Sequence, residues 1–112
     1  MVGCGGDRDK SKRPIMGNIA SSLSTKVVFT SDNPRYENPS QIIDDIMDGV
    51  SSENLEKVTR ITDRRKAIEK ALSIAKKNDI VLVAGKGHES YQEINGIKNN
   101  FDDFEVIKNI IS

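Results

Sequence analysis

The 112-residue sequence predicts an α/β fold, with a Rossmann-like and mostly parallel sheet, crossover helices and an antiparallel hairpin near the C-terminus. Segments with helical spacing of apolar residues alternate with short apolar runs, which is typical of parallel strands joined by helices. The β-branched run from Asp79 to Ala84 indicates a central strand buried on both faces. Asn95-Gly96 is the favoured two-residue hairpin turn, so residues 91–94 and 97–101 are expected to pair.

The first elements come from the glycine loop and one amphipathic segment. Met1-Val2 before Gly3 predicts the end of a strand whose larger part is absent. Pro14 suits the first turn of a helix, because its backbone nitrogen needs no partner there. The residues that recur on the apolar face expected to point inward are Ile15, Met16, Ile19, Ala20 and Leu23. Residues 26–30 are then expected to form a strand.

The later elements are marked by helix-capping residues. Asn38 and Pro39 predict the start of a second helix, and Gly49 suits its C-terminal cap. A strand is expected near 58–61. Asp63 and Asp102 each predict the N-cap of a further helix. The apolar positions of these three helices are Ile42, Ile43, Ile46 and Met47, then Ala67, Ile68, Ala71, Leu72 and Ala75, and finally Phe104, Val106, Ile107, Ile110 and Ile111.

Composition restricts the class of protein. Seventeen basic and seventeen acidic side chains cancel without long blocks of one sign, which argues against a nucleic-acid or membrane partner. The longest strongly apolar stretch, 80–84, is too short to cross a bilayer, and no signal-peptide pattern is evident, so a cytoplasmic location is expected. Cys4 is the only cysteine, which excludes an intrachain disulfide and a cysteine-rich metal site.

Polar segments follow three of the predicted strands, at 3–13, 31–37 and 85–91. Because the carboxyl ends of parallel strands share one edge of a sheet, we expect these loops to converge into one site. Arg35, in the tetrad Asp32-Asn33-Pro34-Arg35, offers a planar guanidinium that suits a carboxylate.

The loop from Gly85 to Glu89 is a weak phosphate motif, because the rest of a P-loop is missing. Glu89 is either a partner for a ligand ammonium or a solvated carboxylate. A lone histidine such as His88 more often makes hydrogen bonds in a loop than binds a metal ion.

Three motifs taken together resemble the C-terminal domain of the Mur ligases, and within that family the members that add meso-diaminopimelate. They are Gly3 to Pro14, Asp32 to Arg35, and Gly85 to Glu89 with Tyr91-Gln92. The resemblance implies that residues 1–112 are the amino-acid-binding domain of an ATP-dependent amide ligase of peptidoglycan synthesis. In such a ligase the glutamate carboxylate of a UDP-linked muramoyl dipeptide becomes an acyl phosphate, which the incoming amine attacks.

The resemblance also implies roles for single residues. Arg13, Asn33 and Arg35 match residues that hold the distal carboxylate of diaminopimelate, and Gly85 and Glu89 match those that receive its distal ammonium. Family members that add lysine lack the arginine of the tetrad. The implied substrate-binding set is Arg13, Asp32, Asn33, Pro34, Arg35, Gly85 and Glu89. The charged residues of the first loop that are candidates for a nucleotide-side role, left open here, are Asp7, Arg8 and Lys10.

Several family features are missing from this sequence. It has no P-loop, no magnesium-organising lysine and no UDP-binding domain, and the first strand, first helix and most of the second strand of the family's C-terminal domain are expected upstream of Gly3. ATP and Mg²⁺ are therefore expected in the full-length enzyme, with neither bound by this chain alone and no metal site within it.

The chain alone is expected to be inactive as a ligase. Its expected partners are a small-molecule amino acid, the missing N-terminal and central domains, and a second copy bound through the sheet edge or face that the missing elements leave exposed. One alternative is a stand-alone amino-acid-binding or sensor module without catalysis. Another is an interaction domain that resembles a response receiver.

Overall fold

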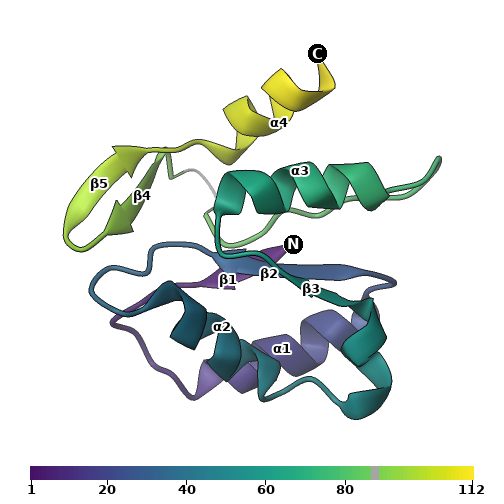
Figure 1. Ribbon diagram of the computed structural model, residues 1–112, viewed down its shortest axis with the longest axis horizontal. Coiled ribbons are helices and arrows are strands. Elements are labelled where there is room, and N and C mark those ends of the chain that lie inside the picture. Colours follow the sequence, from purple (N-terminus) through teal and green to yellow (C-terminus); the bar gives the residue numbers. More distant parts are fainter. Residues whose placement is uncertain (87–88) are drawn as a thin grey trace.

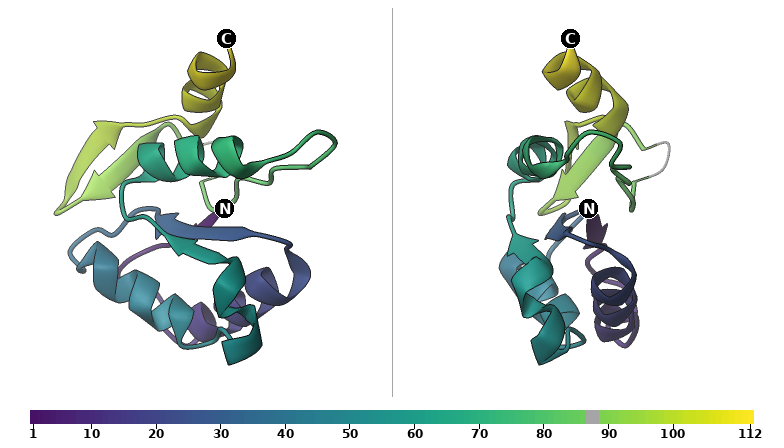
Figure 2. Two further views of the ribbon diagram at one scale, coloured as in Figure 1. Left: turned by 45° about the vertical axis from the view of Figure 1, so that its right-hand side comes forward. Right: turned by 90° about the vertical axis from the view of Figure 1, so that its right-hand side faces the viewer.

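The structure, a computed structural model, describes residues 1–86 and 89–112. Three parallel strands form a sheet in the order β1-β2-β3, and β4 and β5 form an antiparallel hairpin, which confirms the predicted fold class. Helices α1 and α2 lie on one side of the sheet and α3 and α4 on the other (Figures 1 and 2). The elements in chain order are β1 (Val2–Cys4), α1 (Lys12–Leu23), β2 (Val27–Ser31), α2 (Pro39–Met47), the 3₁₀ helix η1 (Ser52–Lys57), β3 (Val58–Arg60), α3 (Arg64–Ile74), β4 (Tyr91–Ile94), β5 (Ile97–Asn100) and α4 (Asp103–Ile111).

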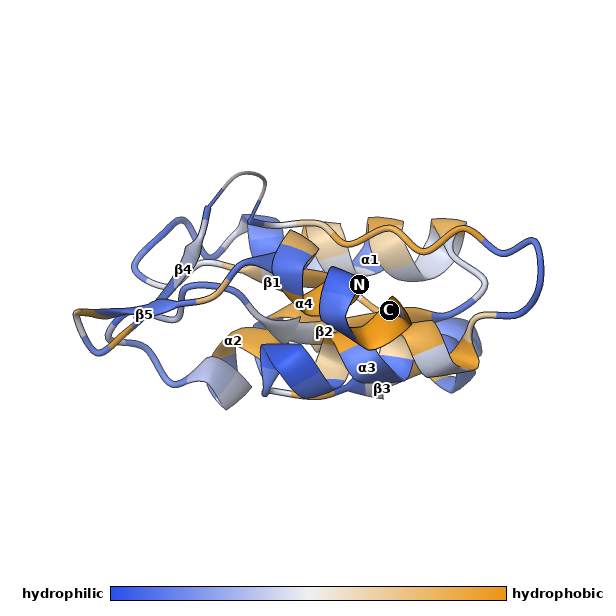
Figure 3. Cartoon of the chain, turned by 90° about the horizontal axis from the view of Figure 1, so that it is seen from above, coloured by the Kyte–Doolittle hydropathy of each residue, from blue (hydrophilic) through white to orange (hydrophobic). Residues whose placement is uncertain are grey.

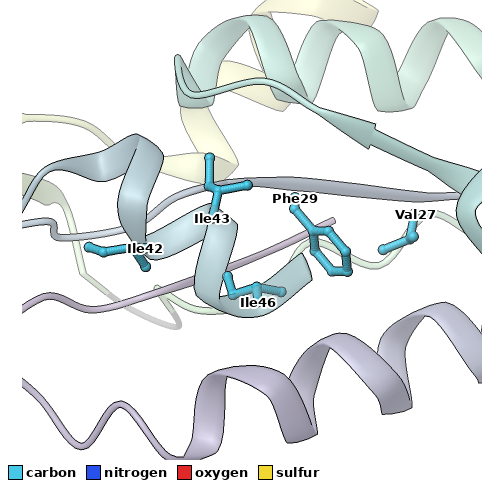
Figure 4. Close-up of a cluster of buried hydrophobic side chains, with 5 residues drawn as sticks. All are labelled: Val27, Phe29, Ile42, Ile43 and Ile46. Atoms are coloured by element: carbon cyan, nitrogen blue, oxygen red, sulfur yellow. The ribbon is translucent and has the colours of Figure 1, made fainter. Parts of the chain in front are cut away.

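The core has two parts, one on each side of β2. On one side, Val27 and Phe29 pack against the isoleucines of α2 at positions 42, 43 and 46 (Figure 4). On the other, Val28 packs against Ala67 and Ala71 of α3. All five residues of β2 are buried, because helices cover both faces of this central strand. The strand is therefore a rigid base for the loop that follows it.

The three predicted N-caps are confirmed, whereas the C-cap of α2 is Asp48 and not Gly49. The side chain of Asn38 accepts hydrogen bonds from the backbone N–H groups of residues 40 and 41, with Pro39 as the first helical residue. Asp63 accepts from the backbone N–H of residue 66 at the start of α3, and Asp102 accepts from those of residues 104 and 105 at the start of α4. Each cap satisfies backbone donors that have no partner inside the helix.

The prediction of a buried central strand at 79–84 is wrong. This segment lies beside β1 and pairs with it at a single bridge, between Val2 and Ala84, while the N-terminal amine of Met1 donates to the carbonyl of Leu82. Ile80 is 95% exposed and Leu82 is 72% exposed. Burial on two faces needs covering layers on both sides, and the described residues place none over these two side chains.

The predicted inward face of α1 is wrong at three of its five positions, whereas Met16 and Ala20 are partly buried and Ala20 packs against the core. Ile15, Ile19 and Leu23 are exposed, and the buried positions are Arg13, Gly17 and Ser21. The reason is close packing against α2: a Cβ atom at Gly17 would lie 1.9 Å from the backbone oxygen of Ile46. The absence of a side chain at Gly17 lets the two backbones approach, while the larger Ile15, Ile19 and Leu23 stay exposed.

The displaced apolar residues of α1 border a cleft. Its volume is about 540 Å³, and its lining includes Ile19 and Leu23 of α1 with Ile80 and Leu82 of the extended segment. Figure 3 shows the strongly hydrophobic stretch of that segment. Within the described residues, no helix is long and apolar enough to cross a bilayer.

Candidate amino-acid-binding site

The loops that follow β1 and β2 meet the segment around residues 85–91. The backbone N–H of Gly6 donates to the carbonyl of Asn33 at 2.7 Å, and Arg35 Nη1 donates to the carbonyl of Gly6 at 2.9 Å. The side chains of Asn33 and Glu89, 56 positions apart in sequence, are joined by a hydrogen bond of 3.1 Å. The predicted convergence of the three loops is therefore confirmed.

Arg35 is held in a backbone conformation that side chains rarely adopt. Its φ is +52°, and the hairpin holds it there: the N–H of Arg35 donates to the carbonyl of Glu93, and the N–H of Asn95 donates to the carbonyl of Arg35. Backbone strain of this kind is typical of functional loops. The side chain is 19% exposed, and its Nε lies 3.6 Å from Glu93 Oε1. The side chain is thus partly open to solvent at the edge of the loop cluster.

Lys86 is the buried centre of the site. Its Nζ donates to Asp32 Oδ1 at 3.0 Å, to Asn33 Oδ1 at 3.1 Å and to the carbonyl of Tyr91 at 2.7 Å. An ammonium group has three protons to donate, so these bonds use all of them. The side chain is fully buried, and Asp32 neutralises its charge.

Glu89 is held by two uncharged donors. Asn33 Nδ2 donates to its Oε1, and the Tyr91 hydroxyl donates to its Oε2 at 3.2 Å. The hydrogen bond to this carboxylate raises the pKa of Tyr91, because the phenol proton is shared with a negative group. Neither of these two donors neutralises the carboxylate, so Glu89 is suited to a ligand cation.

Arg13, expected to bind substrate, is instead engaged by protein groups. Its side chain is 2% exposed. Nη1 donates to Glu37 Oε1 and to Asp45 Oδ2 at 2.8 Å, and Nη2 donates to Glu37 Oε2 and to the carbonyl of Gly5 at 3.0 Å. These bonds lower the pKa of Glu37 to about 2. The geometry makes Arg13 a brace between the glycine loop and α2.

Two further members of the expected set contribute backbone shape. The ring of Pro34 is fully buried, and its carbonyl lies where a side chain on Gly6 would be: a Cβ atom there would be 1.9 Å from that oxygen. Gly85 has a φ of +121°, and a Cβ atom on it would approach the carbonyl of Gly3 to 3.2 Å. Glycine at both positions allows the loops to pack closely.

The charged residues Asp7, Arg8 and Lys10 are exposed. The N–H of Asp7 donates to Glu37, and Lys10 Nζ lies 3.6 Å from the same carboxylate. Their proposed nucleotide-side role stays a prediction. His88 lies outside the described residues. Within the described part of the chain, no group of three or more histidine, cysteine, aspartate or glutamate side chains is placed to hold a metal ion.

Sequence reasoning missed Lys86, Tyr91, Glu37 and Asp45 as parts of this site. Lys86 stands between two glycines, and this pattern indicates only a weak phosphate motif. Its partner Asp32 is 54 positions away, and Glu37 and Asp45 are 24 and 32 positions from Arg13. A charged residue in a polar loop gives no local signal of burial. One signal was available in the sequence. The motifs of Asp32 and Lys86 both follow predicted strands, and loops at neighbouring strand ends are close enough to form an ion pair.

The comparison with protein families now decides the family. The model described as "Mur ligase, glutamate ligase domain" matches residues 1–87. This chain belongs to the Mur ligase family. The matched region includes β1, β2, the tetrad and Lys86, whereas Glu89 and Tyr91 of the loop cluster lie beyond it. Residues 88–112, with the hairpin and α4, follow the matched region.

Curated relatives extend the match to the whole chain. UDP-N-acetylmuramoyl-L-alanyl-D-glutamate--2,6-diaminopimelate ligase of Bacteroides thetaiotaomicron is 53% identical over 112 residues, which is 100% of this chain and 23% of that protein. The ligase of the same name from Clostridium tetani is 55% identical over 111 residues, covering 99% and 22% respectively.

A solved structure of a ligase with this name superposes with a TM-score of 0.91 at 46% identity, over 98% of this chain and 22% of that one. The Mur ligase chain described here thus spans less than a quarter of the length of these relatives.

Proposed function

We propose that this chain is the C-terminal, amino-acid-binding part of an ATP-dependent amide ligase that adds meso-diaminopimelate to UDP-N-acetylmuramoyl-L-alanyl-D-glutamate. The observation that carries the proposal is the arrangement around Asn33. Its backbone oxygen lies 3.5 Å from Arg35 Nη1, and its side-chain nitrogen lies 3.1 Å from Glu89 Oε1. A cation and an anion thus each contact the same residue.

This arrangement suits the distal end of meso-diaminopimelate, which carries both a carboxylate and an ammonium group. Arg35 would bind the carboxylate, and Glu89 would bind the ammonium with help from the Gly85 backbone. Asn33 would contact both the carboxylate and the ammonium group of this distal end. Asp32, Pro34 and Arg13 would hold the loops in place, because their polar groups or ring are already buried against protein.

The Mur ligases are ATP-dependent, and ATP and Mg²⁺ would be held by parts of the longer ligase that lie outside this chain. The bound nucleotide supplies activation of the glutamate carboxylate of the dipeptide. The role of this chain is to hold the attacking amino acid in position and to exclude water, which accelerates amide formation by fixing the reacting groups. The chain alone is expected to have no ligase activity, and an assay of ATP- and dipeptide-dependent turnover checks this.

The relatives do not favour the alternative of a stand-alone sensor module, because the curated proteins reported above carry the ligase name. The receiver-like alternative is not supported either, because the family match covers residues 1–87. The cytoplasmic location expected from the sequence stays a prediction.

Calorimetry with the purified chain tests the pocket. We expect meso-diaminopimelate to bind and L-lysine to bind at least ~10-fold more weakly, because lysine lacks the distal carboxylate and leaves Arg35 without its ligand partner. Arg35→Ala should weaken meso-diaminopimelate roughly 10- to 100-fold and bring the two ligands to similar affinity. Arg65→Ala, at an exposed arginine of α3, is the matched control. Equal affinities for both ligands in the unaltered chain would contradict the proposal.

The predicted homodimer stays a prediction that the exposed apolar residues support. Leu23 and Ile80 are 83% and 95% exposed beside the apolar cleft, and burying them against a second copy would remove this surface from water. Sedimentation should then show association that increases with concentration, and Leu23→Lys should weaken it while the exposed Ser22→Lys on the same helix does not. A monomer at all concentrations would contradict the dimer.

A further inference from the structure

We propose that Lys86 and Tyr91 are positioning residues that fix the Glu89 carboxylate toward a ligand ammonium, with Lys86 acting through Asn33. The inference rests on the proposed function. It assigns roles to two side chains that, on this geometry, need not touch the ligand. It also explains how a carboxylate can be held firmly and still keep its negative charge for a ligand.

The Lys86 ammonium donates all of its hydrogen bonds to groups inside the protein. Its three donors bind Asp32, Asn33 and the carbonyl of Tyr91, and its side chain has no exposed surface. Because Asp32 balances its charge, Lys86 neither neutralises Glu89 nor strongly repels an incoming ammonium. Its effect on the ligand must therefore pass through the groups it holds.

The side-chain amide of Asn33 is held in one orientation. Its oxygen accepts two hydrogen bonds, from Lys86 Nζ and from the backbone N–H of Glu93 at 2.9 Å. Two donors at one end fix the oxygen there, so the NH₂ end must point the other way. That end donates to Glu89 Oε1. Removal of the Lys86 ammonium takes away one of the two bonds that keep the amide from turning over.

The other carboxylate oxygen of Glu89 also has a donor. The Tyr91 hydroxyl donates to Glu89 Oε2. The Tyr91 ring is itself covered by the ammonium of Lys98, which lies 4.7 Å from the ring centroid. Glu89 is thus held at both oxygens by uncharged donors, which restrict its rotamers without cancelling its charge. The expected consequence is a preorganised site for one cation.

Tyr91→Phe is the cleanest test, because it removes one hydroxyl and keeps the ring. We expect it to weaken meso-diaminopimelate binding roughly 5- to 10-fold in calorimetry, the effect of one lost hydrogen bond. Tyr36→Phe, at the other tyrosine and 73% exposed, is the matched control and should leave binding unchanged. Equal affinity of Tyr91→Phe and the unaltered chain would overturn the role of Tyr91.

A readout without ligand tests the contact itself. In a Tyr36→Phe background, the ultraviolet absorbance of tyrosinate reports Tyr91 alone. Glu89→Gln should lower the pKa of Tyr91, since the carboxylate that favours the protonated phenol is gone. An unchanged titration would overturn the proposed geometry. This measurement decides the positioning even if the unaltered chain does not bind meso-diaminopimelate, which would instead reject the proposed function.

The role of Lys86 is tested by removing and restoring its ammonium. Lys86→Met should weaken meso-diaminopimelate binding ~10-fold or more, whereas Lys70→Met, at an exposed lysine of α3, should not. Because Lys86→Met leaves Asp32 unpaired, Asp32→Asn is compared with the Asp32→Asn, Lys86→Met double variant. A further loss in the double variant supports positioning through Asn33, and equal affinity overturns it.

Chemical rescue separates positioning from a general loss of structure. Lys86→Cys in a Cys4→Ala background is alkylated while unfolded with 2-bromoethylamine, in which the thiolate forms a C–S bond and bromide leaves, and is then refolded. The product restores an ammonium on a side chain of nearly the same length as lysine. Recovery of binding supports the role of Lys86. Binding that stays lost in a folded, alkylated chain overturns it.

Discussion

Replacing Arg13 with methionine is expected to reduce the free energy of unfolding by about 3 kcal/mol, near the lower end of the loss seen when one partner of a buried ion pair is removed. The guanidinium is 2% exposed and binds Glu37, Asp45 and the carbonyl of Gly5, all of which lose a partner. The lower end applies because the two carboxylates are 17% and 23% exposed and regain some contact with water. Urea unfolding measures the difference.

A surface arginine provides the matched control for this variant. Arg60 also pairs with an aspartate, Asp44, but both side chains are about half exposed. Arg60→Met should therefore change the free energy of unfolding by less than about 1 kcal/mol. Similar losses in Arg13→Met and Arg60→Met would contradict the interpretation of Arg13 as a buried brace.

The effect of Arg13→Met is expected to shrink in acid. Arg13 lowers the pKa of Glu37 from its usual value of 4.5 to about 2 in the folded chain. A depressed carboxylate pKa contributes stability that is fully present above about pH 4.5 and is lost as the pH falls toward 2. The pKa of Asp45 is lowered for the same reason and acts in the same direction. The free energies of unfolding of Arg13→Met and the unaltered chain should differ less near pH 2 than at pH 7.

Arg64→Met is expected to have a still larger effect, a loss of about 3–5 kcal/mol, because the side chain of Arg64 is fully buried. Its Nε and Nη2 bind both carboxylate oxygens of Asp103 at 2.8 and 2.7 Å, and its Nη1 donates to the carbonyl of Ser31. This arginine therefore ties α4 to the end of β2. We expect the amide hydrogens of α4 to exchange faster in the variant, beyond the change expected from stability alone.

Arg65 is the neighbouring arginine of α3 and is exposed, so Arg65→Met is the matched control and should stay within about 0.5 kcal/mol of the unaltered chain. Urea unfolding and hydrogen exchange on the same samples test both variants. Unchanged exchange in α4 of Arg64→Met would show that Arg64 does not anchor this helix.

The family assignment and the proposed chemistry depend on different observations. The match of the family's domain model to residues 1–87 establishes the family. The proposed substrate depends on the contacts that Arg35 and Glu89 each make with Asn33. Arg13 joins the glycine loop to Glu37 and α2, and its role as a third ligand group, which the resemblance implies, stays a prediction.

The sequence by itself determined the order of the helices and strands apart from the strand expected at 79–84, together with the hairpin at Asn95-Gly96 and the starts of three helices. Capping at Asn38, Asp63 and Asp102 uses donors two or three residues away, so the signal is complete within a short window. The family motifs are also local, and they led to the correct family without any knowledge of contacts between loops.

Only the tertiary structure decided which side of α1 is buried, where residues 79–84 lie and which charged side chains are paired inside the protein. The side of α1 depends on how closely Gly17 allows α2 to approach. The roles of Lys86 and Arg13 depend on carboxylates 24 to 54 positions away in the chain. Periodicity and residue type describe what a side chain favours, whereas burial and pairing depend on which distant groups the fold brings within hydrogen-bond distance.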